Sequence, residues 1–119
     1  MANPFVHIEL QTQDLKKSKK FYAGMFDWKL EELPGMDYTI IKVGDGTGGG
    51  MMKKPVPGMP DNWLPYILVD DVAASTKKAQ ILGATIYKEV TEVPDMGWFS
   101  VITDPTGATF GLWQLKAMK

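Results

Sequence analysis

A weak internal repeat constrains the fold of this chain more than any other feature. Residues 6–11 alternate between apolar and polar side chains and precede Asp14, and the apolar residues 66–69 precede Asp71. Each aspartate can cap a helix, because its side chain can accept hydrogen bonds from the amide groups of the first turn. A strand and a capped helix that recur after about 57 residues predict two copies of one folding unit.

The two expected helices also correspond in their inward-facing positions. Superposing one aspartate on the other places Leu15 on Val72 and Ser18 on Ser75. Spacings of three and four residues are typical of the buried stripe of an amphipathic helix. The stripes are Leu15, Ser18, Tyr22, Met25 and Phe26 in the first helix, and Val72, Ser75, Ala79 and Leu82 in the second. Gly83 is expected to end the second helix.

Three short segments with strand character follow each expected helix. They are residues 28–33, 38–43 and 47–53 after the first, and residues 85–90, 97–103 and 109–115 after the second. Turn-forming residues separate them, and the glycine-rich segment 46–50 predicts a tight hairpin whose backbone approaches either a ligand or another strand. Prolines exclude a regular helix at residues 54–62. We therefore expect one domain over residues 1–119, with module one at 1–53, a linker at 54–62 and module two at 63–119.

Composition and charge exclude several classes of protein. The absence of cysteine excludes disulfides and thiolate metal sites and favours a reducing, cytoplasmic location. A net charge of −1 gives no attraction to nucleic acids. The one basic cluster is expected to form a solvated helix face, because its lysines lie opposite the first apolar stripe; they are Lys16, Lys17, Lys19 and Lys20. No secretory signal and no membrane-spanning run are predicted. Nucleic-acid and membrane partners are therefore not expected.

Three segments are together similar to one known family. They are Val6-His7-Ile8-Glu9-Leu10 with Asp14-Leu15, Phe21-Tyr22 and Phe26-Asp27-Trp28; residues 63–72, Trp-Leu-Pro-Tyr-Ile-Leu-Val-Asp-Asp-Val; and residues 104–113, Asp-Pro-Thr-Gly-Ala-Thr-Phe-Gly-Leu-Trp. They resemble the glyoxalase/bleomycin resistance protein/extradiol dioxygenase (vicinal oxygen chelate) superfamily. This resemblance implies an α+β fold in which two tandem βαβββ modules form a curved, half-barrel mixed sheet around one cavity. It does not imply one reaction, because the superfamily contains lyases, dioxygenases, epimerases and drug-binding proteins.

The resemblance also implies where a metal would be held. Enzymes of the family hold a divalent metal with His, Glu or Gln side chains from four strands, and His7 stands at the first of these positions. Leu64 and Gly111 stand at two others, and the fourth lies within residues 49–52, Gly-Gly-Met-Met. A catalytic metal needs about three protein ligands, and methionine sulfur is a poor ligand for hard metals. Neither a metal nor another cofactor is therefore expected.

Strand alternation predicts which side chains face the cavity. His7, Glu9 and Gln11 share one face of the first strand. We expect the cavity to be lined also by Met51 or Met52, Leu64, Tyr66, Thr109 and Trp113. The carboxylate of Glu9 is expected to hold His7 as a donor or to raise its basicity, so the two could form a general acid–base pair or a structural pair.

Three functions remain open from the sequence, and the last of them is an interaction or assembly module. The first is a small-molecule-binding, glyoxalase-like protein with a degenerate metal site, whose ligand is small and partly apolar or aromatic. The alternative is a lyase or isomerase of the same group that uses His7 and Glu9, with or without a divalent metal. A homodimer is expected in either case, because two-fold pairing is the commonest assembly. Trp28, Trp63 and Trp98 are interpreted as core or interface residues.

Overall fold

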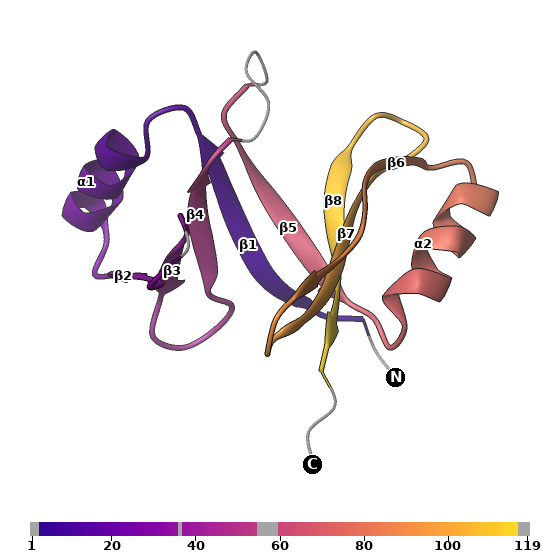
Figure 1. Cartoon of the computed structure of the whole chain (residues 1–119). Helices are drawn as coiled ribbons and strands as arrows, with labels where there is room; N and C mark the ends of the chain where they lie inside the picture. Colours follow the sequence, from indigo (N-terminus) through magenta and orange to yellow (C-terminus); the bar gives the residue numbers. More distant parts are fainter. Residues whose placement is uncertain (1–2, 36, 55–59, 117–119) are drawn as a thin grey trace. The chain divides into compact units, whose positions relative to one another are not determined.

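Eight strands and two helices follow one another as βαβββ twice in the computed structural model, which describes residues 3–35, 37–54 and 60–116 (Figure 1). The first series is β1 (Phe5–Thr12), α1 (Leu15–Met25), β2 (Lys29–Glu32), β3 (Thr39–Lys42) and β4 (Gly49–Lys53). The second series is β5 (Asn62–Leu68), α2 (Val72–Ile81), β6 (Thr85–Val93), β7 (Gly97–Thr103) and β8 (Thr109–Leu115). The predicted α+β class and its two βαβββ series are confirmed.

The chain divides into two compact units. The first unit is His7–Leu64, and the second takes in residues 3–6 and 65–116 of the described chain. Residues 3–6 group with the second unit because the Leu68 amide donates to the Pro4 carbonyl at 2.9 Å and the Asn3 side chain donates to the Leu68 carbonyl at 2.9 Å. The predicted module one, residues 1–53, includes residues 3–6. The grouping of these residues with the second unit depends on backbone hydrogen bonds, which a side-chain pattern does not reveal.

Each unit carries a mixed sheet with the same arrangement of strands. The order is β2-β3-β4-β1 in the first unit, where β1 and β4 are parallel and the other pairs antiparallel. In the second unit the order is β5-β8-β7-β6, with β5 and β8 parallel. Equivalent arrangements are expected of a repeated unit. The half-barrel around a common cavity stays a prediction.

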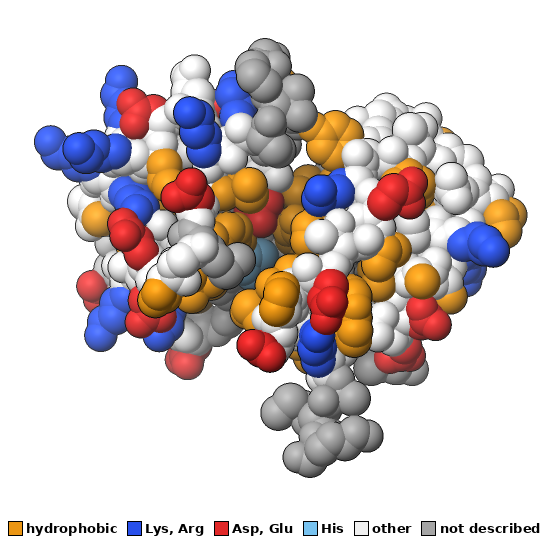
Figure 2. Space-filling model, viewed as in Figure 1, with side chains coloured by type: hydrophobic (Ala, Val, Ile, Leu, Met, Phe, Trp, Pro, Cys, Tyr) orange, Lys and Arg blue, Asp and Glu red, His pale blue; other side chains and the backbone are white. Residues whose placement is uncertain are grey.

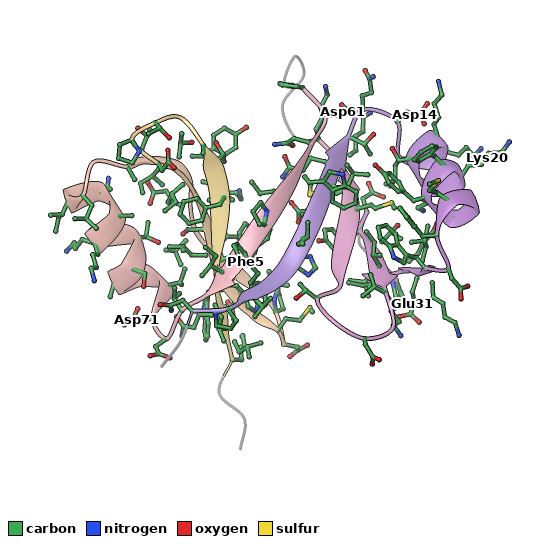
Figure 3. All side chains as sticks on the ribbon, turned by 180° about the vertical axis from the view of Figure 1, so that it is seen from behind. Phe5, Asp14, Lys20, Glu31, Asp61 and Asp71 are labelled. Carbon is green, nitrogen blue, oxygen red and sulfur yellow. The ribbon has the colours of Figure 1, made fainter. Side chains whose placement is uncertain are left out.

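Both helices begin at the aspartates that the sequence marks. The carboxylate of Asp14 accepts from the Lys17 amide at 3.0 Å, and that of Asp71 accepts from the Ala74 amide at 3.0 Å (Figure 3). Gly83 follows α2 with a φ of +102°, a left-handed conformation in which glycine is favoured. Local hydrogen bonding therefore sets the ends of these elements.

The helices pack on one face of their own sheets. Leu10, Ile41 and Met51 form the first buried cluster, with Leu15, Tyr22, Trp28, Leu30 and Val43 packed against it. Val72, Ile102 and Leu112 form the second, which Trp98 contacts. Lysine side chains gather over α1 in Figure 2, and Lys16, Lys17 and Lys20 are exposed, which confirms the solvated helix face. Among the described residues, no helix is long and apolar enough to cross a bilayer.

Residues 55–59 of the predicted linker lie outside the described residues. On either side of them, Lys54 donates its amide to the Thr12 carbonyl at 2.9 Å, and its ammonium lies 3.2 Å from the carboxylate of Asp61. β5 begins at Asn62, within the segment predicted as linker and four residues before the predicted strand. Prolines are accepted in a strand where no amide is required, so Pro65 does not interrupt β5.

Candidate functional site

β1 presents its alternate side chains to two environments. Leu10 packs into the helix-side core, and His7, Glu9 and Gln11 lie on the opposite face of the strand. Glu9 is 6% exposed and Gln11 is 7% exposed, and His7 is half-buried. A carboxylate buried to this extent is strongly destabilising unless hydrogen bonds replace its hydration. The partners of Glu9 therefore decide what this face can do.

A chain of hydrogen bonds joins these three side chains to Tyr38, and we call the four residues the polar centre. The Tyr38 hydroxyl donates to Oε1 of Glu9 at 2.9 Å, and the Gln11 amide donates to Oε2 at 2.9 Å. Nε2 of His7 lies 2.6 Å from the Tyr38 hydroxyl oxygen. Because the single O–H of Tyr38 is donated to Glu9, Nε2 of His7 carries the hydrogen that Tyr38 accepts. Nδ1 is then the basic nitrogen of the ring.

Burial lowers the pKa of His7 below its ordinary value of 6.5, because a low-dielectric environment disfavours the imidazolium form. Of the two expected effects of Glu9, a raised basicity of His7 is therefore wrong in direction, because burial outweighs it, and a donor role of His7 stays a prediction. The hydroxyl of Tyr38 is hydrogen-bonded to both groups. A neutral histidine at pH 7 can accept a proton.

Tyr38 fills the space that a side chain on β4 would need. Gly50 is paired with Glu9, and a Cβ atom built on Gly50 would lie 2.1 Å from the Tyr38 hydroxyl. Only glycine at this position lets the phenol reach the carboxylate. Tyr38 is not among the site residues predicted from the sequence, because it precedes β3 and is 29 residues from Glu9 along the chain. The sequence signal for it is the pair of glycines within residues 49–52, where the family has a ligand side chain.

The second unit repeats the placement of a tyrosine over a glycine. Tyr66 is paired with Gly111, and a Cβ atom on Gly111 would lie 2.3 Å from the Tyr66 ring. The ring meets Phe99 edge-on, with centroids 6.2 Å apart. Thr109 and Trp113 alternate with the α2-facing Leu112 and so share the face of Gly111. Their roles as ligand contacts, with that of Tyr66, stay predictions.

The remaining predicted lining residues lie in the first unit. Leu64 is buried, with 2% exposed. Met51 is fully buried in the helix-side core with Leu10, so the prediction that its side chain faces the ligand is wrong. Met52 pairs with Gln11 and shares its face. The sequence left the two methionines open because a one-residue change of register exchanges the faces of a strand.

The side chains present do not fit the metal site that the resemblance implies. A tyrosine ring occupies the space of a side chain at Gly111 and at Gly50, which is one of the residues 49–52 that contain the fourth position. At the third, Leu64 has no donor atom, which leaves His7. Within residues 3–35, 37–54 and 60–116, no three His, Cys, Asp or Glu side chains are grouped so that they could hold an ion. This donor set falls short of the three ligands that a catalytic metal needs.

Comparisons with known proteins agree on one family. The family model described as Glyoxalase/Bleomycin resistance protein/Dioxygenase superfamily matches residues 5–112. CFP32 of Mycobacterium tuberculosis, which carries a provisional glyoxylase name, is 36% identical over 107 residues, covering 87% of this chain and 41% of CFP32. The anthracycline biosynthesis protein DnrV of Streptomyces peucetius is 26% identical over 128 residues, covering 93% of this chain and 46% of DnrV. The chain thus spans less than half the length of these relatives.

Solved structures share the fold. A methylmalonyl-CoA epimerase from Streptomyces coelicolor has a TM-score of 0.70 at 13% identity, covering 100% of this chain and 99% of that chain. The hypothetical protein BH1468 of Bacillus halodurans has a TM-score of 0.70 at 15% identity, with the same coverage. At these identities the likeness shows the fold alone.

Proposed function

This chain belongs to the Glyoxalase/Bleomycin resistance protein/Dioxygenase superfamily, and we propose that it binds a small molecule at the polar centre without a metal ion. The observation that supports this proposal is the Tyr38 hydroxyl, which hydrogen-bonds Glu9 and His7 in the space over Gly50. The hydroxyl of Tyr38 is thus hydrogen-bonded to His7, the residue that stands at the first metal-ligand position of the family.

The chemistry of the polar centre limits the class of ligand. Glu9 offers an acceptor, Gln11 and Tyr38 carry donors, and His7 adds a nitrogen that is neutral at pH 7. An anionic ligand would be repelled by the carboxylate, and the repulsion is stronger at a buried position than in water. We expect a neutral ligand with a hydroxyl, amide or carbonyl group on a small, partly apolar or aromatic body.

A second candidate function is proton transfer on such a ligand. The short contact of 2.6 Å between His7 and Tyr38 favours it, because a neutral imidazole and a phenol are a base and an acid in one hydrogen-bonded chain. Nδ1 of His7 would take a proton from a carbon next to a carbonyl, and the Tyr38 O–H would turn from Glu9 to donate to the carbonyl oxygen, where the negative charge of the enolate develops. This is the chemistry of an isomerase or lyase, as in the alternative drawn from the sequence.

Thermal shift measurements test the proposal. Zn²⁺, Mn²⁺ and Mg²⁺ should leave the Tm of EDTA-treated protein unchanged, and a neutral small molecule from a fragment panel should raise it, because binding to the folded state alone stabilises by mass action. Tyr38→Phe keeps the ring but removes the hydroxyl, and it should weaken that ligand about tenfold, the effect of one good hydrogen bond. Tyr87→Phe, at an exposed tyrosine of β6, is the matched control.

A metal-dependent rise in Tm would reject metal-free binding. To separate binding from catalysis, the ligand found in the panel is incubated with the protein in D₂O. Exchange of a carbon-bound hydrogen that is lost in His7→Ala would establish proton transfer, and binding without exchange would restrict the function to binding. The expected homodimer is tested separately, by light scattering.

A further inference from the structure

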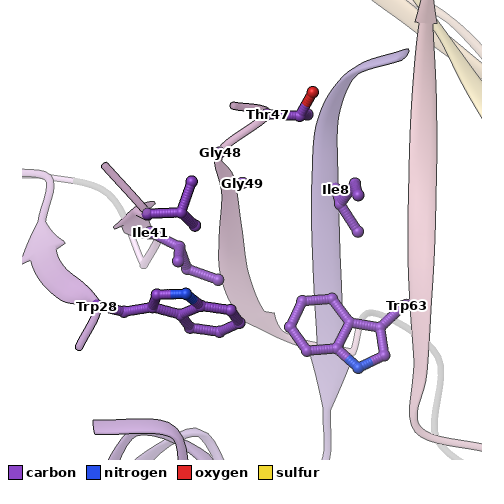
Figure 4. A pocket seen from close by; sticks show the side chains of 8 residues that line it. Ile8, Trp28, Ile41, Thr47, Gly48, Gly49 and Trp63 are labelled. Carbon is purple, nitrogen blue, oxygen red and sulfur yellow. The ribbon is translucent and has the colours of Figure 1, made fainter. Parts of the chain in front are cut away.

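A pocket lies in the first unit, on the sheet face opposite the polar centre. Ile8 and Ile41 belong to its lining, and Ile8 points away from the face of its neighbours His7 and Glu9. Trp28, Val43, Thr47 and Trp63 complete the side chains around it (Figure 4). Its volume is about 240 Å³. The proposed function makes no use of this pocket.

Two indole rings form a right-angled corner in the pocket. The ring centroids of Trp28 and Trp63 are 6.4 Å apart, and the ring planes meet at 82°. Tyr22 holds both in place, since it stacks on Trp28 at 5.8 Å and meets Trp63 edge-on at 5.4 Å. A planar guest can stack on one indole while it meets the other edge-on, and both geometries are favourable for aromatic pairs.

Backbone forms one wall of the pocket. A Cβ atom on Gly49 would lie 1.8 Å from the Ile8 carbonyl oxygen, and one on Gly48 would lie 2.8 Å from the Ile41 carbonyl oxygen. The close approach of β1 and β4 therefore requires glycine, as the sequence predicts for this hairpin. This part of the wall has no side chain that could fill the pocket by changing rotamer. Trp63 is 37% exposed, so a guest would bury apolar surface that water now contacts.

Charge and size define the class of guest. Among the described residues that line the pocket, none has an ionisable side chain, so an ion would lose its hydration without compensation. A dry apolar cavity of about 150 Å³ accommodates benzene, and pockets for drug-sized ligands begin near about 300 Å³. From these features together, we propose that the corner between Trp28 and Trp63 binds a neutral aromatic compound of one or two fused rings.

Indole is a suitable probe, and the four tryptophans of the chain supply the readout. Indole is titrated into the intact ¹⁵N-labelled protein while the side-chain N–H signals are followed by NMR. The signals of Trp28 and Trp63 should move and saturate together, and those of Trp98 and Trp113, in the second unit, should not move. Indole-3-carboxylate, which has the same ring and a negative charge, should bind at least tenfold more weakly.

Two variants test the position of the guest. Trp63→Ala removes one side of the corner and should lower the affinity for indole at least tenfold. Val43→Phe should lower the affinity to the same extent by filling the pocket. Circular dichroism checks that each variant folds. Trp98→Phe is the matched control and should leave the affinity unchanged. Tyr38→Phe should also leave it unchanged, so this test and that of the proposed function can fail independently.

Three results would overturn the proposal. The first is an equal response of all four indole signals, which indicates non-specific binding. The second is an unchanged affinity in Trp63→Ala. The third is a shift of the Trp28 and Trp63 signals with protein concentration in the absence of indole, since the pocket and the exposed Phe26, which contacts Trp28, would then belong to a self-association surface.

Discussion

Substituting Gly50 with alanine tests whether the space over this glycine belongs to Tyr38. The new Cβ atom would lie 2.1 Å from the Tyr38 hydroxyl oxygen, well inside any allowed contact. The atom it meets is the far end of a side chain, so the ring can swing away. The free energy lost should therefore reflect the broken hydrogen bonds and not a persistent steric clash.

The expected magnitude follows from the contacts that Tyr38 makes. Two hydrogen bonds are lost, to Glu9 at 2.9 Å and to His7 at 2.6 Å, each worth about 1 kcal/mol. A buried carboxylate oxygen that loses its donor adds about 1 to 2 kcal/mol. These losses come to about 3 to 4 kcal/mol. Replacing an unconstrained glycine in a strand by alanine gains about 0.5 to 1 kcal/mol, so Gly50→Ala should lower the free energy of unfolding by about 2 to 3.5 kcal/mol.

Urea unfolding followed by circular dichroism measures this change, and a double-mutant cycle assigns its cause. In a Tyr38→Ala background the clash is absent, so Gly50→Ala should alter stability by less than about 1 kcal/mol, which leaves a coupling of at least about 1 kcal/mol. Gly24→Ala is the control, because a Cβ atom there meets nothing within 4 Å and alanine favours the helix. An equal loss in both backgrounds, or no loss in the native one, would refute the reasoning.

Three further predictions concern His7, the second unit and the helix caps. The pKa of His7 is lowered on folding, so the unfolded chain binds its proton first as the pH falls, and the free energy of unfolding should decrease below about pH 6.5; His7→Gln should remove this decrease in urea titrations at pH 5 and 7. Gly111→Ala should lower the Tm more than Gly50→Ala does, because the added Cβ lies 2.9 Å from Cγ of Tyr66, near the root of a ring that cannot swing away; calorimetry showing the reverse order would contradict this. Asp71→Ala should lower the free energy of unfolding by about 1 kcal/mol, whereas Asp71→Asn, which keeps the capping oxygen, should lower it less.

The helices and strands of this protein, and their duplication, follow from local patterns in the sequence. Asp14 and Asp71 mark the helix starts, because capping involves atoms only three residues away. The alternation of apolar and polar residues on β1 places Leu10 and Glu9 on opposite faces of the sheet, because successive side chains of a strand point to opposite faces. Such local rules, taken with the resemblance, were enough for the α+β class and for the pair His7 and Glu9.

The side chains that these elements bring together depend on contacts between segments that are distant in the sequence. Tyr38 reaches Glu9 across 29 residues of chain, and it can do so only because Gly50 leaves a space. The register of β4 buries Met51, and not Met52, in the helix-side core. The sequence could not predict which of the two is buried, because two consecutive methionines show no alternation of apolar and polar residues. The corner of Trp28 and Trp63 joins residues 35 positions apart. Each feature depends on contacts between distant segments. The role of a glycine that leaves space for another side chain can be recognised only when the residue that occupies this space is known.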